Sequence, residues 1–133
     1  MARYEHLPIF KRSYELALVC EELVRGFSRY HKYGLGQDLR DGARAIVLQV
    51  VRVNDAWDKL PEMDRLRLLL AEMQIIARLC KDTRAFPNFK AFERVSLLVQ
   101  DIARQSEGWR NSEATKARAG ANGVRPESPT PRG

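Results

Sequence analysis

Apolar residues recur with the spacing of an α-helix in four separate segments of the chain, and this repeat restricts the fold more than any other feature. The segments are residues 8–25, 35–57, 63–83 and 89–109. In each of them, apolar side chains three and four positions apart fall on one face, which has to be buried against other helices. Alternating β-branched residues are scarce, so the pattern predicts an all-α protein.

The lengths of the segments and of their connections predict how the helices are arranged. Each segment would form a helix of roughly 27–35 Å, because an α-helix rises about 1.5 Å per residue. The connections are short, so consecutive helices should be antiparallel. The sequence therefore predicts one domain over residues 1–110, an up-down-up-down four-helix bundle. Residues 111–133 are rich in Ala, Gly, Pro, Ser and Arg without an apolar repeat, and we expect them to form a disordered basic tail.

The third segment carries a second apolar stripe. If Leu66 is placed at zero on a helical wheel, Leu68, Ile75 and Leu79 fall at about 180° to 220°, opposite the core line. Three apolar residues in register on an outward face indicate an interface more often than a coincidence. We therefore predict that these three residues contact another copy of the chain in a homo-oligomer.

The stretch GFSRYHKYGLGQDLRDG, residues 26–42, interrupts the helical pattern with basic, aromatic and glycine residues. Three interpretations compete: a plain connection between helices, a phosphate-binding loop, or a family signature. The phosphate-binding loop is disfavoured, because such loops follow a strand and continue with further glycine or with Gly-Lys-Ser/Thr. The glycines are better explained as a turn that leads into the second helix.

The basic residues give the only candidates for a binding site. Arg29 and Lys32 alternate with tyrosines, a combination suited to phosphate contact and base stacking. The other candidates lie one turn apart on the second helix or along one side of the third, and they are Arg40, Arg44, Arg67, Arg78 and Lys81. The competing interpretation is an ordinary solvated charged surface, since a net charge of +6 does not require a nucleic-acid partner.

No pattern in the sequence predicts catalysis, a cofactor, a metal site or a small-molecule substrate. His31 has no nucleophile or carboxylate at a recognisable spacing, and the metal-ligand patterns CxxC, HxxxH and HExxH do not occur. Cys20 and Cys80 fall on apolar helix faces, so we expect reduced thiols in the core of a cytoplasmic protein. We also expect no secretory signal and no membrane partner, because no apolar run approaches the roughly 20 residues of a membrane span.

Four stretches together resemble the Avd family, the accessory variability determinants of diversity-generating retroelements. They are LPIFKRSYELAL (7–18), FSRYHKYGLGQDLRD (27–41), LRLLLAEMQIIARL (66–79) and VSLLVQDIARQSEGW (95–109). The resemblance covers nearly all of residues 7–110, and its most specific parts are the aromatic-basic loop before Leu-Gly-Gln and the closing Gly108-Trp109. Asp38 departs from it, because many members have a basic residue at this position.

The resemblance implies a function. It implies a non-catalytic, pentameric barrel of four-helix bundles that binds the element's reverse transcriptase and its template RNA, or an RNA/DNA hybrid, during mutagenic cDNA synthesis. The basic residues named above would then contact nucleic acid or the polymerase. The alternative is a structural interaction protein of the type encoded in ribosomal RNA intervening sequences, a related family of four-helix bundles, without a polymerase partner.

Overall fold

The computed structural model describes residues 4–121 of the chain, and this range contains helices and turns but no strand. A short 3-10 helix, η1 (Tyr4–His6), precedes α1 (Pro8–Arg25). The remaining elements, in order, are α2 (Arg29–Lys32), α3 (Leu35–Asp55), α4 (Lys59–Asp82) and α5 (Phe89–Ala121).

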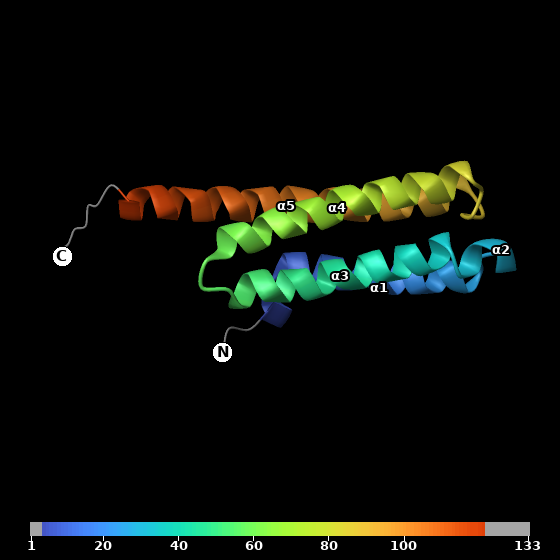
Figure 1. Cartoon of the computed structure of the whole chain (residues 1–133), viewed down its shortest axis with the longest axis horizontal. Coiled ribbons are helices and arrows are strands. Elements are labelled where there is room, and N and C mark those ends of the chain that lie inside the picture. The colour runs from blue at the N-terminus through green and yellow to red at the C-terminus, as the bar shows by residue number, and fades with distance from the viewer. Residues whose placement is uncertain (1–3, 122–133) are drawn as a thin grey trace.

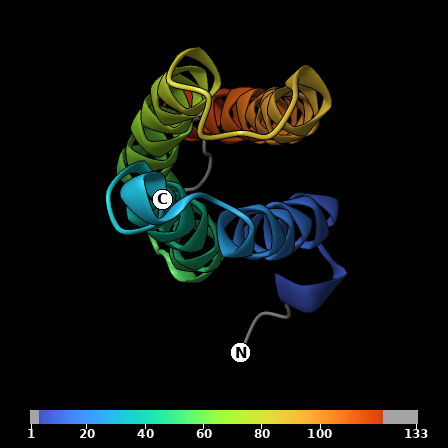
Figure 2. The ribbon, with the colours of Figure 1, turned by 90° about the vertical axis from the view of Figure 1, so that its right-hand side faces the viewer.

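The four long helices form an antiparallel bundle. Figure 1 shows α1 beside α3 and α4 beside α5, with each long helix running opposite to the one before it. Viewed from one end, the helices occupy four corners in the order α1, α3, α4 and α5 (Figure 2). The prediction of an up-down-up-down four-helix bundle is therefore confirmed for the single chain.

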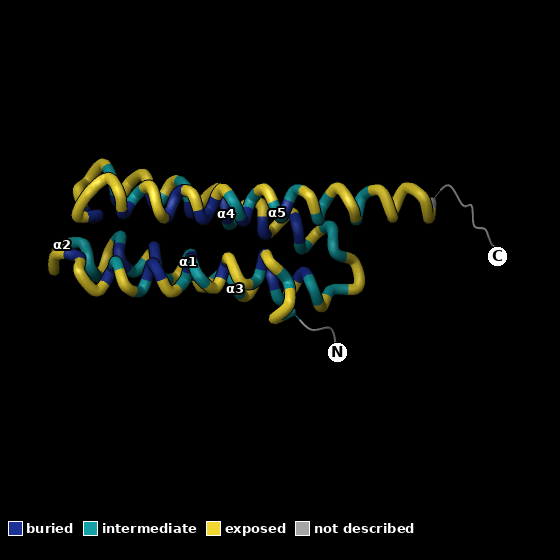
Figure 3. The backbone as a smooth tube through the Cα atoms, turned by 180° about the vertical axis from the view of Figure 1, so that it is seen from behind, coloured by how far each residue is buried: buried dark blue, intermediate teal, exposed yellow. Residues whose placement is uncertain are grey.

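The core consists of one apolar stripe from each long helix. Buried residues line the inner sides of the helices and exposed residues the outer sides (Figure 3). The largest fully buried side chains include Leu16, Leu39, Ile46, Leu66, Met73 and Ile102. Each side chain of this size contributes about 1.5–3 kcal/mol when it is removed from water.

One expected core residue is exposed. The second predicted segment, residues 35–57, includes Trp57 in its apolar repeat, but α3 ends at Asp55 and leaves Trp57 in the connection, fully exposed. The next helix begins earlier than the pattern indicates, at Lys59. The Nζ atom of Lys59 donates hydrogen bonds to the carbonyl oxygens of Val53, Asn54 and Ala56 at 3.1, 2.8 and 3.1 Å. This ammonium caps the end of α3, and Pro61 fits the first turn of α4, where its missing N–H leaves no bond unmade.

The last helix is longer than the sequence predicts, because the predicted disordered tail would begin at residue 111. Helix α5 continues past Arg110 to Ala121, so residues 111–121 are helical and not disordered. Good helix formers in this stretch, and an ion pair of 3.3 Å between Lys116 Nζ and Glu113 Oε2, support the extension although most of its residues are exposed. An apolar repeat is thus not required for a helix that is already nucleated. Residues 122–133 of the expected tail lie outside the described residues.

Close packing at Gly36 explains why the connection between α1 and α3 requires a glycine there. A β-carbon at this buried position would lie 2.9 Å from Cγ1 of Val24 and 3.0 Å from the carbonyl oxygen of His31. The absence of a side chain lets the first turn of α3 pack directly against the end of α1 and against α2. Residues 26–42 therefore form a connection between helices that leads into α3, as the sequence predicts.

We predict that Gly36→Ala destabilises the protein although alanine is the better helix former. The gain in helix propensity is about 1 kcal/mol, whereas forcing a methyl group against the His31 carbonyl costs about 1–3 kcal/mol. Chemical denaturation should show a net loss of free energy of unfolding. Gly108→Ala is the matched control, because no atom lies within 4 Å of its β-carbon position. It should raise stability by up to about 1 kcal/mol, and a stabilised Gly36→Ala would contradict the packing argument.

Candidate nucleic-acid interface

The connection between α1 and α3 and the connection between α4 and α5 lie at the same end of the bundle. Figure 2 faces this end, where α2 and the turn between α4 and α5 lie nearest the viewer. The rings of Phe27 and Phe86 join the two connections in an edge-to-face contact with centroids 5.8 Å apart, and both residues are buried. Two segments more than fifty positions apart in the sequence therefore form one surface. We call residues 25–34 and 81–90 the loop end.

Positive charge is concentrated on the loop end. Residues 25–34 contain three cationic side chains and no carboxylate, and residues 81–90 contain three cationic side chains and one carboxylate. Together they carry a formal charge of +5, out of +6 for the whole chain. At the opposite end, residues 54–65 contain four carboxylates and two cationic side chains, a charge of −2. The loop end is thus more basic than the connection between α3 and α4, although Asp38 in the first turn of α3 reduces the positive potential near the loop end.

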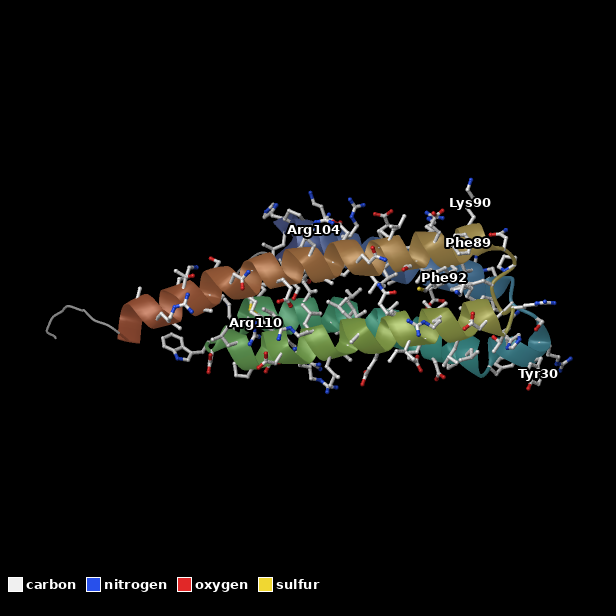
Figure 4. The ribbon with its side chains drawn as sticks, turned by 90° about the horizontal axis from the view of Figure 1, so that it is seen from above. Tyr30, Phe89, Lys90, Phe92, Arg104 and Arg110 are labelled. Carbon is white, nitrogen blue, oxygen red and sulfur yellow. The ribbon has the colours of Figure 1, made fainter. Side chains whose placement is uncertain are left out.

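Exposed aromatic rings accompany this charge. Tyr30, Tyr33 and Phe89 are 87%, 76% and 62% exposed. Figure 4 places Tyr30 and Phe89 at the same end of the molecule, with Lys90 beside Phe89. Cationic groups next to accessible aromatic rings can hold phosphates and stack on bases.

The predicted residues Arg29, Lys32, Arg40 and Arg44 lie at or near this end, but two of them are already paired. Arg40 Nε lies 3.0 Å from Oε1 of Glu21, and Arg44 NH2 lies 3.3 Å from Oε2 of the same carboxylate. Lys32 and Arg40 line a hollow of about 270 Å³ that Glu21 also borders. Arg29 is exposed and forms no ion pair with any residue of the range 4–121.

The three predicted basic residues of the third segment, Arg67, Arg78 and Lys81, are spread along α4 and do not form one patch. Arg67 and Arg78 are eleven positions apart on α4, which corresponds to roughly 16 Å along the helix. Nε and NH2 of Arg67 donate hydrogen bonds of 2.9 and 2.7 Å to the two carboxylate oxygens of Glu107 on α5. The Lys81 ammonium lies 4.9 Å from the ring centroid of Phe92 and 3.5 Å from Oδ1 of Asp82. Arg78 is exposed, with no ion-pair partner in the described part of the chain.

Sequence reasoning missed three residues of the loop end: Arg84, Phe89 and Lys90. Residues 84–88 entered the sequence prediction only as the break between the third and fourth helical segments. The positive charge of residues 81–90 becomes meaningful only when it is added to that of residues 25–34. The predicted antiparallel topology already places both connections at one end of the bundle, and this was the signal that could have found these residues.

The two cysteines and the possible metal ligands of the described residues offer little for chemistry. Burial raises the pKa of Cys20 to about 12 and that of Cys80 to about 11, and both thiols are free, so the reactive thiolate forms are disfavoured. Within residues 4–121 no three His, Cys, Asp or Glu residues gather as metal ligands would. None of the described helices has the length and apolar character needed to cross a membrane.

The outward apolar stripe on α4 lies where the sequence predicts it. Leu68, Ile75 and Leu79 are 50%, 60% and 46% exposed in the single chain. Exposed apolar residues also occur singly or in pairs on the other helices, for example Leu48 on α3 and Leu97 on α5. The helix α4 thus presents the longest such row among the described helices.

Comparison with known proteins adds no assignment: the chain matches no model of a known protein family and no curated protein.

The pair between Arg67 and Glu107 gives a testable pH dependence. Hydrogen bonds from Arg67 lower the pKa of Glu107, so the pair stabilises the fold above the ordinary glutamate pKa of about 4.3 and this stability is lost as the pH falls through the lowered value. Glu107→Gln should therefore lower the free energy of unfolding at neutral pH by about 1 kcal/mol or less, because both side chains are half-exposed. The difference from the wild type should shrink as the pH falls below the ordinary glutamate pKa and vanish once Glu107 is protonated in the folded protein. Glu72→Gln, at an exposed position without an ion pair among residues 4–121, is the control, and equal pH profiles for both variants would contradict the assignment.

Proposed function

We propose that the protein is a non-catalytic accessory protein that binds RNA through the loop end, in the manner that its resemblance to the Avd family implies. The observation that carries the proposal is the concentration of +5 of the chain's +6 formal charge at one end of the bundle, together with three exposed aromatic rings. The loop end includes the aromatic-basic stretch on which the family resemblance depends.

The physical basis is the release of counterions from phosphates. Each phosphate that a lysine or arginine neutralises frees condensed cations, which makes binding both favourable and strongly dependent on salt. Cationic side chains that lack a carboxylate partner are the most effective, because no internal pair has to be broken. Arg29 is such a residue, whereas Arg40 and Arg44 share the carboxylate of Glu21. We therefore assign the main phosphate contacts to the cations of the loop end that have no carboxylate partner, and a lesser role to Arg40, Arg44 and the paired Arg25 and Lys81.

The partners of the proposed function are the template RNA, or an RNA/DNA hybrid, and the reverse transcriptase of a diversity-generating retroelement in the cytoplasm. The paired Arg67 and the unpaired Arg78 on α4 are candidates for the polymerase contact, since they lie away from the loop end or at its margin. The alternative is a structural protein of the ribosomal RNA intervening-sequence type without a polymerase. A reverse transcriptase gene and an adenine-rich near-repeat beside this gene would favour the retroelement.

The proposed assembly is a homopentamer with Leu68, Ile75 and Leu79 at the interface. The half-exposed row on α4 supports an interface, and the resemblance supplies the number of subunits. A cyclic assembly repeats the loop end once per protomer, so that several weak phosphate contacts add up.

We expect a mass of about five protomers from light scattering coupled to size exclusion, and a monomer for Ile75→Asp. Burying an unpaired carboxylate in an apolar interface costs several kcal/mol, whereas the single chain tolerates it because Ile75 is 60% exposed. Ser112→Asp, which adds the same charge at an exposed position of α5, should leave the mass unchanged. A monomeric wild type at micromolar concentration would contradict the proposed assembly.

RNA binding should depend on the position of the charge and not only on its amount. We expect Arg29→Glu with Lys32→Glu to weaken binding of a labelled single-stranded RNA about tenfold or more, as measured by fluorescence anisotropy. Arg52→Glu with Arg65→Glu changes the net charge equally at the opposite end and should cost about threefold or less. Wild-type affinity should fall steeply between about 50 and 200 mM salt. Equal losses for both double variants, or affinity that does not change with salt, would refute an interface at the loop end.

A further inference from the structure

The turn between α4 and α5 contains an arginine in a backbone conformation that suits glycine. Arg84 has a φ angle of 64°, the one positive value recorded for a non-glycine residue in the described chain. Its left-handed geometry ends α4 and allows the Phe86 N–H to donate a hydrogen bond of 3.1 Å to the carbonyl oxygen of Cys80. Helices commonly end with glycine at such a position, because a β-carbon is strained there. The turn therefore keeps a cationic side chain where the backbone alone would favour none, and strain of this kind often marks a functional site.

The aromatic ring of Phe89 packs against a cluster of aromatic side chains that extends to the core. Its centroid lies 5.6 Å from that of Phe92, which lies 6.5 Å from that of the buried Phe86. Figure 4 shows Phe89 at the first turn of α5, above Phe92 and beside Lys90. Although it belongs to this cluster, Phe89 remains 62% exposed. It is thus a supported ring with most of its surface available to a ligand.

Phe89 also borders a hollow whose lining includes two cationic side chains. The hollow has a volume of about 310 Å³ and is lined by Lys81, Arg84, Phe86, Pro87, Asn88 and Phe89. This volume lies at the lower end of the range for small-ligand sites. Arg84 and Lys90 form no ion pair with any residue between 4 and 121. Asn88 Oδ1 accepts a hydrogen bond of 2.9 Å from the Ala91 N–H, which fixes the turn at the start of α5.

We propose that this turn is a binding site for one nucleotide of a single-stranded nucleic acid, with the base stacked on Phe89 and the adjoining phosphates held by Arg84 and Lys90. The inference rests on the proposed function and adds to it a defined site and a selectivity. Stacking on Phe89 requires a base that has left its helix, so the site takes a single strand and not a duplex. The charge on the rest of the loop end attracts both forms alike.

The strained backbone at Arg84 allows a sharp test. Arg84→Gly relieves the left-handed strain, so its thermal midpoint should equal or exceed that of the wild type. The same change removes a phosphate contact, so affinity for a labelled 12-nucleotide oligouridine should fall about fivefold. A residue with only a structural role would not combine a gain in stability with a loss of affinity. Arg52→Gln, which removes one charge at the opposite end, is the matched control and should leave affinity within about twofold.

Phe89→Leu tests the stacking and the selectivity. This variant keeps an apolar side chain but loses the aromatic face, so oligouridine affinity should fall about fivefold or more. Affinity for an RNA duplex of matched phosphate number should not change. Trp57→Leu removes an exposed aromatic ring at the opposite end and should affect neither ligand.

The outcomes separate this inference from the proposed function. If the wild type binds RNA in a salt-dependent manner but Arg84→Gly and Phe89→Leu bind as well as it does, the site is overturned and the proposed function stands. If single strand and duplex lose affinity equally in Phe89→Leu, stacking is overturned. If the wild type binds neither RNA, both proposals fail. A polyglutamate peptide that binds in place of RNA, and loses affinity in the same two variants, would overturn the nucleotide site in favour of an acidic protein partner.

Discussion

The burial of four apolar stripes against one another is the constraint on which the rest of the structure depends. Each stripe is buried only when its helix runs alongside two neighbours, and short connections make consecutive helices antiparallel. This order returns the chain to the same end after α1 and again after α4. The contact between Phe27 and Phe86 is the direct result, and Gly36 allows the first of these connections to pack closely enough for the bundle to close. A surface made of two distant segments is therefore a consequence of core packing.

Charge follows the same topology. The two connections at the loop end are basic, whereas the connection between α3 and α4 at the opposite end is acidic. The pairing of individual cations depends on which helices are neighbours. Arg44 and Arg67 meet carboxylates on α1 and α5, respectively, whereas no acidic residue of the described chain pairs with Arg29 or Arg84. Cations that look equivalent in the sequence thus differ in what they can offer to a phosphate.

The proposed RNA site and the proposed assembly use different parts of the molecule. The loop end lies across one end of the bundle, whereas the apolar row of α4 runs along its side. The two can therefore be altered by different substitutions. In the proposed oligomer, repetition of a modest basic surface would supply affinity that one protomer lacks.

The sequence by itself determined the four helices, their antiparallel order and nearly all of the core, because these depend on an apolar repeat that any helix of this length must bury. It also placed Leu68, Ile75 and Leu79 on an outward face for the same reason. It did not determine where helices end when no burial is involved, as the exposed Trp57 and the continuation of α5 to Ala121 show. Only the tertiary structure decided that Arg40 and Arg44 share one carboxylate, that Arg84 lies in a left-handed turn, and that Phe89 rests on a cluster reaching Phe86. Each of these three findings depends either on contacts between different helices or on a local backbone angle. Contacts of this kind and single backbone angles leave no periodic signal in the sequence.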